Sequence, residues 1–155
     1  MKGSQRVLQA LNALLALELA AVNQYFVHAK ICESWGYDRL AHHFRATSLE
    51  EMKDAEEIIH RILFLEGIPA MAQLPVATGA NVTEQLRADL ETEKRAIKLL
   101  HDGIAASLDD GDQASREFFA SRLLEEEGHA DWLETQLSLI DQIGEGNYLA
   151  QQIRG

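Results

Sequence analysis

The strongest constraint on the fold of this chain is a glutamate that recurs at one position in four amphipathic stretches. In two places a glutamate is followed three residues later by a second side chain able to bind a metal, and each pair has another glutamate 33 residues upstream (51 − 18 = 33 and 126 − 93 = 33). The members are Glu18, Glu51 and Asp54 in the first half of the chain, and Glu93, Glu126 and His129 in the second. The chain shows little other internal similarity, so this repeat predicts two related halves whose glutamates meet.

The glutamates lie within four stretches whose apolar residues have helical spacing. The spacing predicts helices over about residues 5–34, 38–66, 83–110 and 113–143, and a short helix at 147–153. Gly36, and Gly67 with Pro69, are typical of helix ends, and Thr83 is placed to cap the third helix. Residues 1–155 are predicted to form one domain with a sizeable core.

The connector over about residues 67–82 is long for a loop within a bundle, and it holds both prolines of the chain. Its length suits a crossover from one end of a bundle to the other. Two helical hairpins joined by one long crossover form an all-α four-helix bundle, in which metal-binding side chains project inward from facing helices.

The composition argues against several classes of function. A formal net charge of −11 does not suit nucleic-acid or anionic-membrane partners, which need basic patches, but it fits an attraction for cations. The single cysteine, Cys32, rules out an internal disulfide and a Cys-x-x-Cys metal site, and it suggests a reducing compartment. Because the chain has no leader-like start and no run of about 18 apolar residues, we expect a soluble, cytoplasmic protein.

Glutamates rarely lie on the apolar stripe of a helix unless something neutralises them. Here each long predicted helix carries one, and clustered carboxylates without partners repel one another and take up protons. The inner stripes hold no lysine or arginine, so two divalent cations are the expected counter-charge. Carboxylates together with imidazole suit iron or manganese better than a soft metal.

Residues three apart share a helix face, so each paired glutamate can act together with its partner. We expect Glu51 and Glu126 to bridge two metals, with Glu18 and Asp54 completing one position and Glu93 and His129 the other. Tyr25 lies two turns after Glu18 on the same face, where it is expected to hydrogen-bond a ligand or donate an electron. Taken singly, His129 and Tyr25 have simpler interpretations as core or surface residues, and the repeated spacing is what favours metal binding.

Several segments carry a resemblance that covers nearly the whole chain. They are Met1-Lys-Gly, Asn23-Gln-Tyr-Phe, Arg61-Ile-Leu-Phe-Leu-Glu-Gly, Glu126-Glu-Gly-His-Ala-Asp-Trp-Leu-Glu and Asn147-Tyr-Leu. In these segments the chain resembles the bacterioferritins of the ferritin-like superfamily. The resemblance implies a hollow shell of twenty-four subunits, with a di-iron ferroxidase site of two irons in each bundle and haem b shared between two subunits. It also implies a bacterial, cytoplasmic iron store, with iron released by electrons from a small iron–sulfur ferredoxin, and a short fifth helix around the fourfold channels.

Residue by residue, the resemblance implies that the di-iron ligands and catalytic residues are Glu18, Glu51, Glu93, Glu126 and His129. It also implies that Met52 is the axial ligand of the haem; without the family, Met52 is better explained as an interface-packing residue. Position 54 departs from the family, which has histidine where this chain has Asp54. Five carboxylates then over-balance two Fe²⁺, yet an aspartate oxygen reaches as far as a histidine Nδ1. We therefore expect both metal positions to fill, with altered turnover. The family's inner-surface iron site is not expected, because Ala46 and Glu50 replace its histidine and aspartate.

Two other functions are compatible with the sequence. One is a haem-bearing shell subunit with impaired ferroxidase activity, which co-assembles with a competent paralogue in a hetero-oligomer; it is motivated by Asp54 beside a retained Met52. The other is a di-iron peroxidase or oxygenase. The peroxidase of the rubrerythrin type is disfavoured because it uses a four-cysteine module, and this chain has only Cys32.

Overall fold

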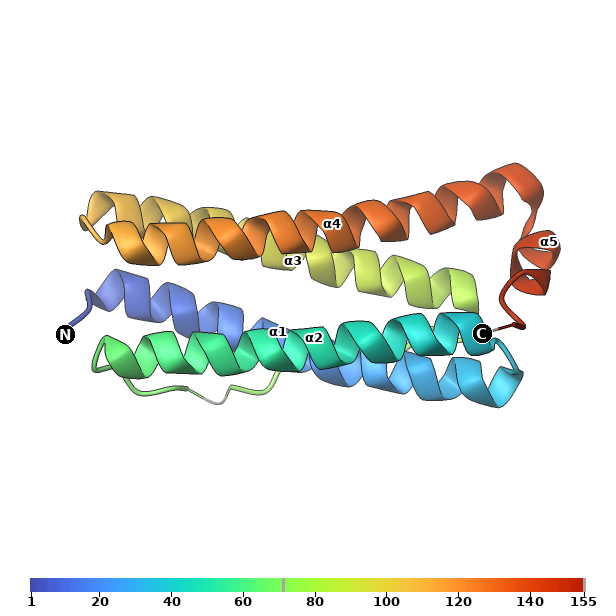
Figure 1. Cartoon of the computed structure of the whole chain (residues 1–155), viewed down its shortest axis with the longest axis horizontal. Helices are drawn as coiled ribbons and strands as arrows, with labels where there is room; N and C mark the ends of the chain where they lie inside the picture. The colour runs from blue at the N-terminus through green and yellow to red at the C-terminus, as the bar shows by residue number, and fades with distance from the viewer. Residues whose placement is uncertain (71, 155) are drawn as a thin grey trace.

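Four long helices lie side by side in the computed structural model, and a short helix crosses one end of them (Figure 1). They are α1 (Gln5–Trp35), α2 (Asp38–Phe64), α3 (Val82–Asp109), α4 (Gln113–Ile143) and α5 (Glu145–Ala150). The structure describes residues 1–70 and 72–154, so Gly155 and also Met71, which falls in the predicted crossover, lie outside the described residues. The prediction of an all-α four-helix bundle with a long crossover and a short fifth helix is confirmed.

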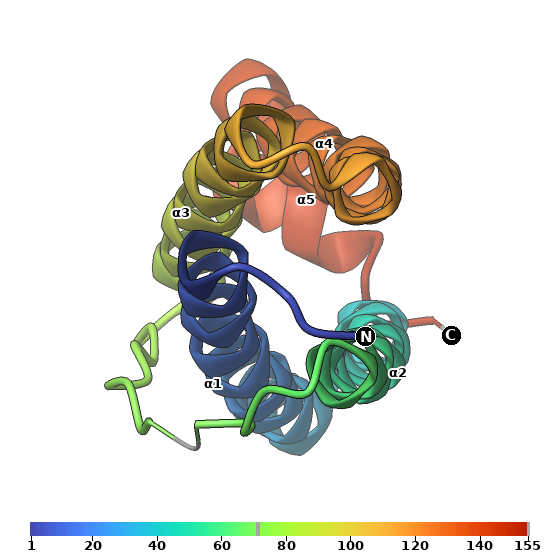
Figure 2. The ribbon, with the colours of Figure 1, turned by 90° about the vertical axis from the view of Figure 1, so that its left-hand side faces the viewer.

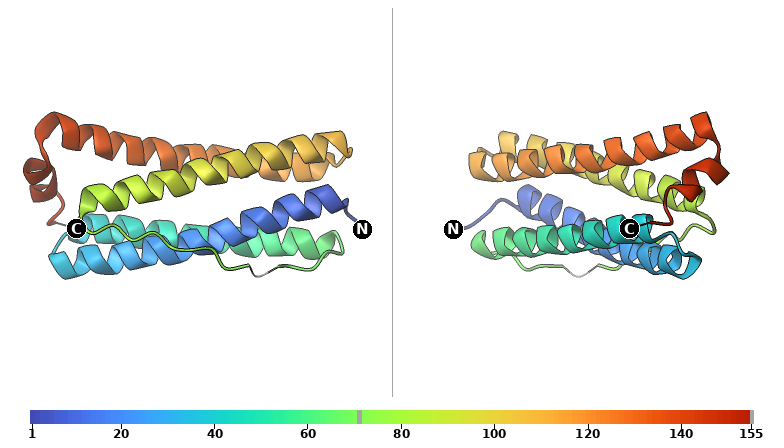
Figure 3. Two further views of the ribbon diagram at one scale, coloured as in Figure 1. Left: turned by 180° about the vertical axis from the view of Figure 1, so that it is seen from behind. Right: turned by 45° about the vertical axis from the view of Figure 1, so that its right-hand side comes forward.

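The bundle consists of two hairpins, α1 with α2 and α3 with α4, and the hairpins meet most closely along α1 and α3. The connector between α2 and α3 runs along the outside of the bundle from one end to the other (Figure 3). The backbones of α2 and α4 approach each other less closely than these pairs do, as the view along the bundle shows (Figure 2). The seam between α2 and α4 must therefore be closed by long side chains.

The ends of the helices follow local backbone chemistry, with two differences from the predicted boundaries. α1 ends at Gly36, whose φ of 85° is accessible to glycine at little cost. The N-cap of α3 is Asn81 and not Thr83: the Asn81 side chain accepts a hydrogen bond from the backbone N–H of Glu84 at 2.9 Å. α5 occupies Glu145–Ala150 instead of 147–153, and the chain after it turns back so that Arg39 N–H donates to the Gln152 carbonyl.

The apolar core is divided along the bundle axis into two clusters. One contains Tyr25, Phe44, Leu86 and Leu133, and the other contains Leu14, Ile58, Leu100 and Phe119. In each long helix the glutamate of the repeat lies in sequence between residues of the two clusters. Packing on both sides thus holds four acidic side chains at one level of the bundle.

Helix α1 is apolar because it is the most buried helix of the bundle. By length and composition alone it is able to cross a membrane, with a mean hydropathy of 1.3 over an 18-residue window. Yet 61% of that window is buried inside the molecule, and its buried positions include Glu18. Packing against the other helices accounts for its hydropathy.

A buried polar network fixes the end of the crossover against α1 and α3. His28 Nε2 accepts a hydrogen bond from Gly79 N–H at 3.2 Å, so its proton lies on Nδ1, which faces Asp89 at 2.9 Å. Gln24 donates to the same carboxylate at 2.9 Å and accepts from the backbone N–H of Ala77. The network satisfies groups that would be costly to bury alone, and it sets the register in which α3 begins.

Two helical glycines provide a matched test of how closely α3 and α4 must pack. A Cβ on Gly103 would lie 2.8 Å from the Phe119 ring, whereas a Cβ on Gly128 would meet nothing within 4 Å. We expect Gly103→Ala to cost about 1–3 kcal/mol of stability through overpacking. Gly128→Ala should gain up to about 1 kcal/mol from helix propensity. Thermal unfolding of the two variants measures both effects, and equal midpoints would contradict close α3–α4 packing at Gly103.

Candidate metal centre

The four long helices each bring one glutamate to the middle of the bundle. Glu18, Glu51, Glu93 and Glu126 are at most 3% exposed, although each is a carboxylate among apolar neighbours. Acidic side chains are almost never this buried unless they are paired. The arrangement predicted from the repeat is therefore present as a physical cluster.

The cluster contains two overlapping groups of potential ligands, and in each group the ligand atoms lie within 4.8 Å of one another. One group is Glu51, Glu93, Glu126 and His129, and the other is Glu18, Glu51, Asp54 and Glu126. Glu51 and Glu126 belong to both groups, which is the geometry expected of side chains that bridge two ions. The ligand roles themselves stay predictions.

Most oxygens of the cluster have no hydrogen-bond donor within the described part of the chain. The buried atoms without a partner include Glu18 Oε2, both Glu51 oxygens, Asp54 Oδ2, Glu93 Oε2, Glu126 Oε2 and His129 Nδ1. Native proteins leave few buried polar atoms unpaired, and such groups call for a specific explanation. One explanation covers all of these atoms: they face positions at which cations would bind. A set of carboxylate oxygens and one imidazole suits iron.

His129 is the basic group closest to the four glutamates. Its Nδ1 lies 3.0 Å from Glu51 and 3.5 Å from Glu126, and its Nε2 lies 3.1 Å from Glu50. Burial opposes a charge on the imidazole, but the surrounding carboxylates outweigh burial and raise the pKa of His129 well above its ordinary value. In the absence of metal, the imidazolium partly neutralises the cluster.

Tyr25 lies against one of the predicted ligands. Its hydroxyl donates a hydrogen bond to Glu93 Oε1 at 2.6 Å. Burial, together with the charge of Glu93, raises the pKa of Tyr25, so the phenol keeps its proton and fixes one oxygen of that carboxylate. The hydrogen bond agrees with the expectation for Tyr25, and its role as an electron donor stays a prediction.

The expectation that no lysine or arginine lies on the inner stripes is wrong. Arg122 lies one turn before Glu126 on α4 and crosses the seam to α2, where its Nη1 donates to Asp54 Oδ1 and its Nη2 lies 2.6 Å from Glu57. Its side chain is 19% exposed, and Glu125 contacts it at 3.3 Å. The fifth carboxylate of the site thus has a basic partner that it shares with Glu57 and Glu125. The four glutamates of the repeat have no arginine or lysine partner among the described residues.

Met52 lies on the outer face of α2, away from the cluster, and is 43% exposed. It lines a cavity of about 440 Å³ together with Leu19, Asn23 and Leu74. The chain therefore presents a thioether in a surface hollow lined by both apolar and polar side chains, and a thioether can bind the iron of a haem.

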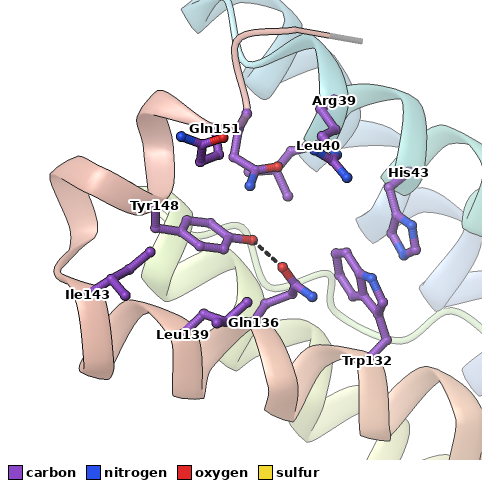
Figure 4. A pocket seen from close by; sticks show the side chains of 10 residues that line it. Arg39, Leu40, His43, Trp132, Gln136, Leu139, Ile143, Tyr148 and Gln151 are labelled. Atoms are coloured by element: carbon purple, nitrogen blue, oxygen red, sulfur yellow. Dashed lines mark hydrogen bonds between the residues drawn. The ribbon is translucent and has the colours of Figure 1, made fainter.

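Two cavities lie on the α2–α4 side of the bundle. One, of about 230 Å³, extends from Tyr25 and His129 past Glu50. The other, of about 510 Å³, lies between α2, α4 and α5 and contains the hydrogen bond from Tyr148 to Gln136 (Figure 4). His43 and Trp132 line both cavities, and their rings stack at 3.6 Å. The stacked pair separates the metal centre from the larger cavity.

The fold and the inward carboxylates define a ferritin-type bundle with a candidate two-metal centre. The model of the ferritin-like domain matches residues 8–143. Bacterioferritin of Brucella melitensis is 44% identical over 149 residues, which cover 96% of this chain and 92% of that protein. The bacterial ferritin of Neisseria meningitidis serogroup A is 42% identical over 154 residues, 99% of this chain and 100% of that protein. The chain belongs to the ferritin-like family and, within it, to the bacterioferritins.

The metal-free centre should make stability depend on pH. Burial raises the pKa of Glu51 to about 8 and that of Glu126 to about 9, from an ordinary 4.5. Between pH 4.5 and these values the folded protein binds more protons than the unfolded chain, so stability should fall as pH rises. The raised pKa of His129 acts in the same direction, because the folded state keeps a proton that the unfolded chain loses.

Thermal unfolding of the metal-free protein between pH 5 and 9 measures this slope. A saturating divalent cation should flatten it by displacing the protons. A midpoint that rises with pH in the metal-free protein would contradict the assignment of raised pKa values to the buried glutamates.

Proposed function

We propose that this protein stores iron and that each subunit is a ferroxidase. Family membership supports iron storage, and the carboxylate and imidazole groups support iron binding. One observation carries the ferroxidase proposal: two overlapping groups of potential ligands share Glu51 and Glu126, and most of their carboxylate oxygens accept no hydrogen bond. Two adjacent cation positions suit a reaction that takes one electron from each of two Fe²⁺ ions.

In this reaction two Fe²⁺ ions enter as substrates and O₂ accepts one electron from each. With two protons from solvent, the reduced oxygen leaves as hydrogen peroxide. Four glutamates balance the charge of two Fe²⁺, and Glu51 and Glu126 hold the ions close enough to react with one oxygen molecule. Tyr25 keeps Glu93 oriented through its hydrogen bond. The Fe³⁺ products then leave for a ferric mineral inside the shell.

Homo-oligomeric assembly into a shell follows from the family, and twenty-four subunits is the proposed number. Haem b is proposed to bind between two subunits, with Met52 of each as an axial ligand, and it supplies one-electron transfer when bound. The half-exposed thioether and the hollow beside it, which Leu19 and Leu74 help to line, support this fit. A small iron–sulfur ferredoxin is the proposed electron donor for iron release, and the cytoplasm the proposed compartment.

A second function is favoured by the contact between Arg122 and Asp54. If the guanidinium withholds Asp54 from iron, the chain is a haem-bearing shell subunit with impaired ferroxidase activity that co-assembles with a competent paralogue. The pure homopolymer distinguishes the two functions, because only the first predicts rapid oxidation of Fe²⁺ without another subunit.

Neighbouring glutamates on α4 provide a matched test of the ferroxidase proposal. Glu126 is 1% exposed in the cluster, whereas Glu127 is exposed. Glu126→Gln should slow the rapid oxidation of Fe²⁺ by at least about tenfold, since even the outer partners of metal ligands are worth that much. Glu127→Gln should leave the rate unchanged. Stopped-flow absorbance after mixing with O₂ measures both, and equal rates in the two variants would refute a site at Glu126.

The haem proposal is tested by Met52→Leu. Leucine keeps the apolar volume but removes the sulfur, so the variant should lose the visible haem spectrum. Its free energy of unfolding should stay within about 1 kcal/mol of that of the unaltered protein. Absorption spectroscopy of the assembled protein, reconstituted with haem, measures this. Retention of the same spectrum by the variant would exclude Met52 as the axial ligand.

A further inference from the structure

Arg122 is a basic residue at the edge of the candidate metal centre. It crosses from α4 to α2 and contacts three carboxylates, those of Asp54, Glu57 and Glu125. Its guanidinium also lies over the Phe118 ring, at 5.5 Å from the centroid. These contacts from both helices fix the guanidinium at the edge of the cluster, where it has little freedom to swing out to solvent.

The contact with Asp54 uses only one oxygen of the carboxylate. Asp54 Oδ1 accepts from Arg122, while Asp54 Oδ2 is buried without a partner. An oxygen of Asp54 also lies within 4.8 Å of ligand atoms of Glu18, Glu51 and Glu126. The carboxylate is thus held on one side and open on the other.

We propose that Arg122 is a positioning residue that presents Asp54 to the metal ion beside Glu18 and offsets part of its charge. This inference rests on the proposed two-ion site and adds a residue to it. The guanidinium holds Asp54 Oδ1 and leaves Oδ2 free to face the ion. Its positive charge, which is shared with Glu57 and Glu125, reduces the excess of negative charge that a fifth carboxylate brings to the centre.

Exchange of Asp54 for histidine changes the charge beside Arg122. Asp54→His alone leaves the guanidinium at the edge of the centre, still held by Glu57 and Glu125 but facing an imidazole instead of a carboxylate. Its positive charge then opposes the incoming cation more strongly. The single variant should therefore bind the second ion more weakly than the unaltered protein. Replacing Arg122 as well, with the uncharged Met of similar length, should restore binding.

The proposal is tested without any turnover by titrating the assembled, iron-free protein with Co²⁺ under anaerobic conditions. Calorimetry and the visible absorption of the bound ion measure the binding. The unaltered protein should bind two Co²⁺ per subunit. Arg122→Met should weaken one of the two by about 10–100-fold, the range found for partners of metal ligands. Arg122→Lys should recover part of that loss, and its visible spectrum should differ because a lysine holds one oxygen less rigidly.

Arg95→Met is the matched control, because Arg95 is exposed on α3 and its removal changes the net charge equally. Two outcomes overturn the proposal: Arg122→Met binds both ions as tightly as Arg95→Met does, or it binds the second ion more tightly, which makes the guanidinium a competitor. In both, the two-ion site itself survives. If the unaltered protein binds fewer than two Co²⁺, both this inference and the proposed two-ion site are refuted.

Discussion

The burial of four carboxylates at one level of the bundle, without a lysine or arginine partner among the described residues, is the constraint on which the rest of the structure depends. Glu18, Glu51, Glu93 and Glu126 each place a group that prefers water among apolar neighbours, and burial raises the pKa of Glu51 and Glu126 as a result. Apolar clusters on both sides, one around Phe44 and the other around Phe119, hold these side chains in place. The bundle thus tolerates a locally unfavourable arrangement because its ends are well packed, and the cations proposed to bind there would offset its cost.

The same constraint explains why α2 and α4 are joined differently from the other helices. Their backbones stay further apart, and polar side chains span the seam. Near one end of the seam, Arg61 contacts Asp112 and Ser115. In the middle, Arg122 contacts Asp54 and Glu57. Further along, His129 contacts Glu50 and Glu51. Cations bound at the centre would belong to this series, because Glu51 and Glu126 come from opposite sides of the seam. Cations at the proposed centre would therefore also hold α2 and α4 together.

The sequence predicted the helices and the level of the glutamates because both follow from periodicity, which a single chain displays directly. It did not predict Arg122, although the information was present: residue 122 lies four positions before Glu126 and so shares its helix face. Arg122 lies beside the buried stripe of α4 that contains Phe119 and Glu126, and a long arginine there reaches inward where a short side chain would not. The sequence also did not predict the N-cap of α3. Asn81 and Thr83 are both good N-cap residues, and the path of the crossover before α3 decides between them.

The two halves of the site differ in the charge of the group that lies behind the inner side chain. Asp54 and His129 occupy equivalent positions of the repeat. The Nδ1 atom of His129 faces the glutamates, and an aspartate oxygen reaches as far from the backbone as this atom does. Behind His129 lies the carboxylate of Glu50, and behind Asp54 lies the guanidinium of Arg122. Each inner side chain is thus held from behind by a group of complementary charge. On the proposed role of Arg122, the exchange of histidine for aspartate at position 54 is therefore accompanied by a change in the sign of the group behind it.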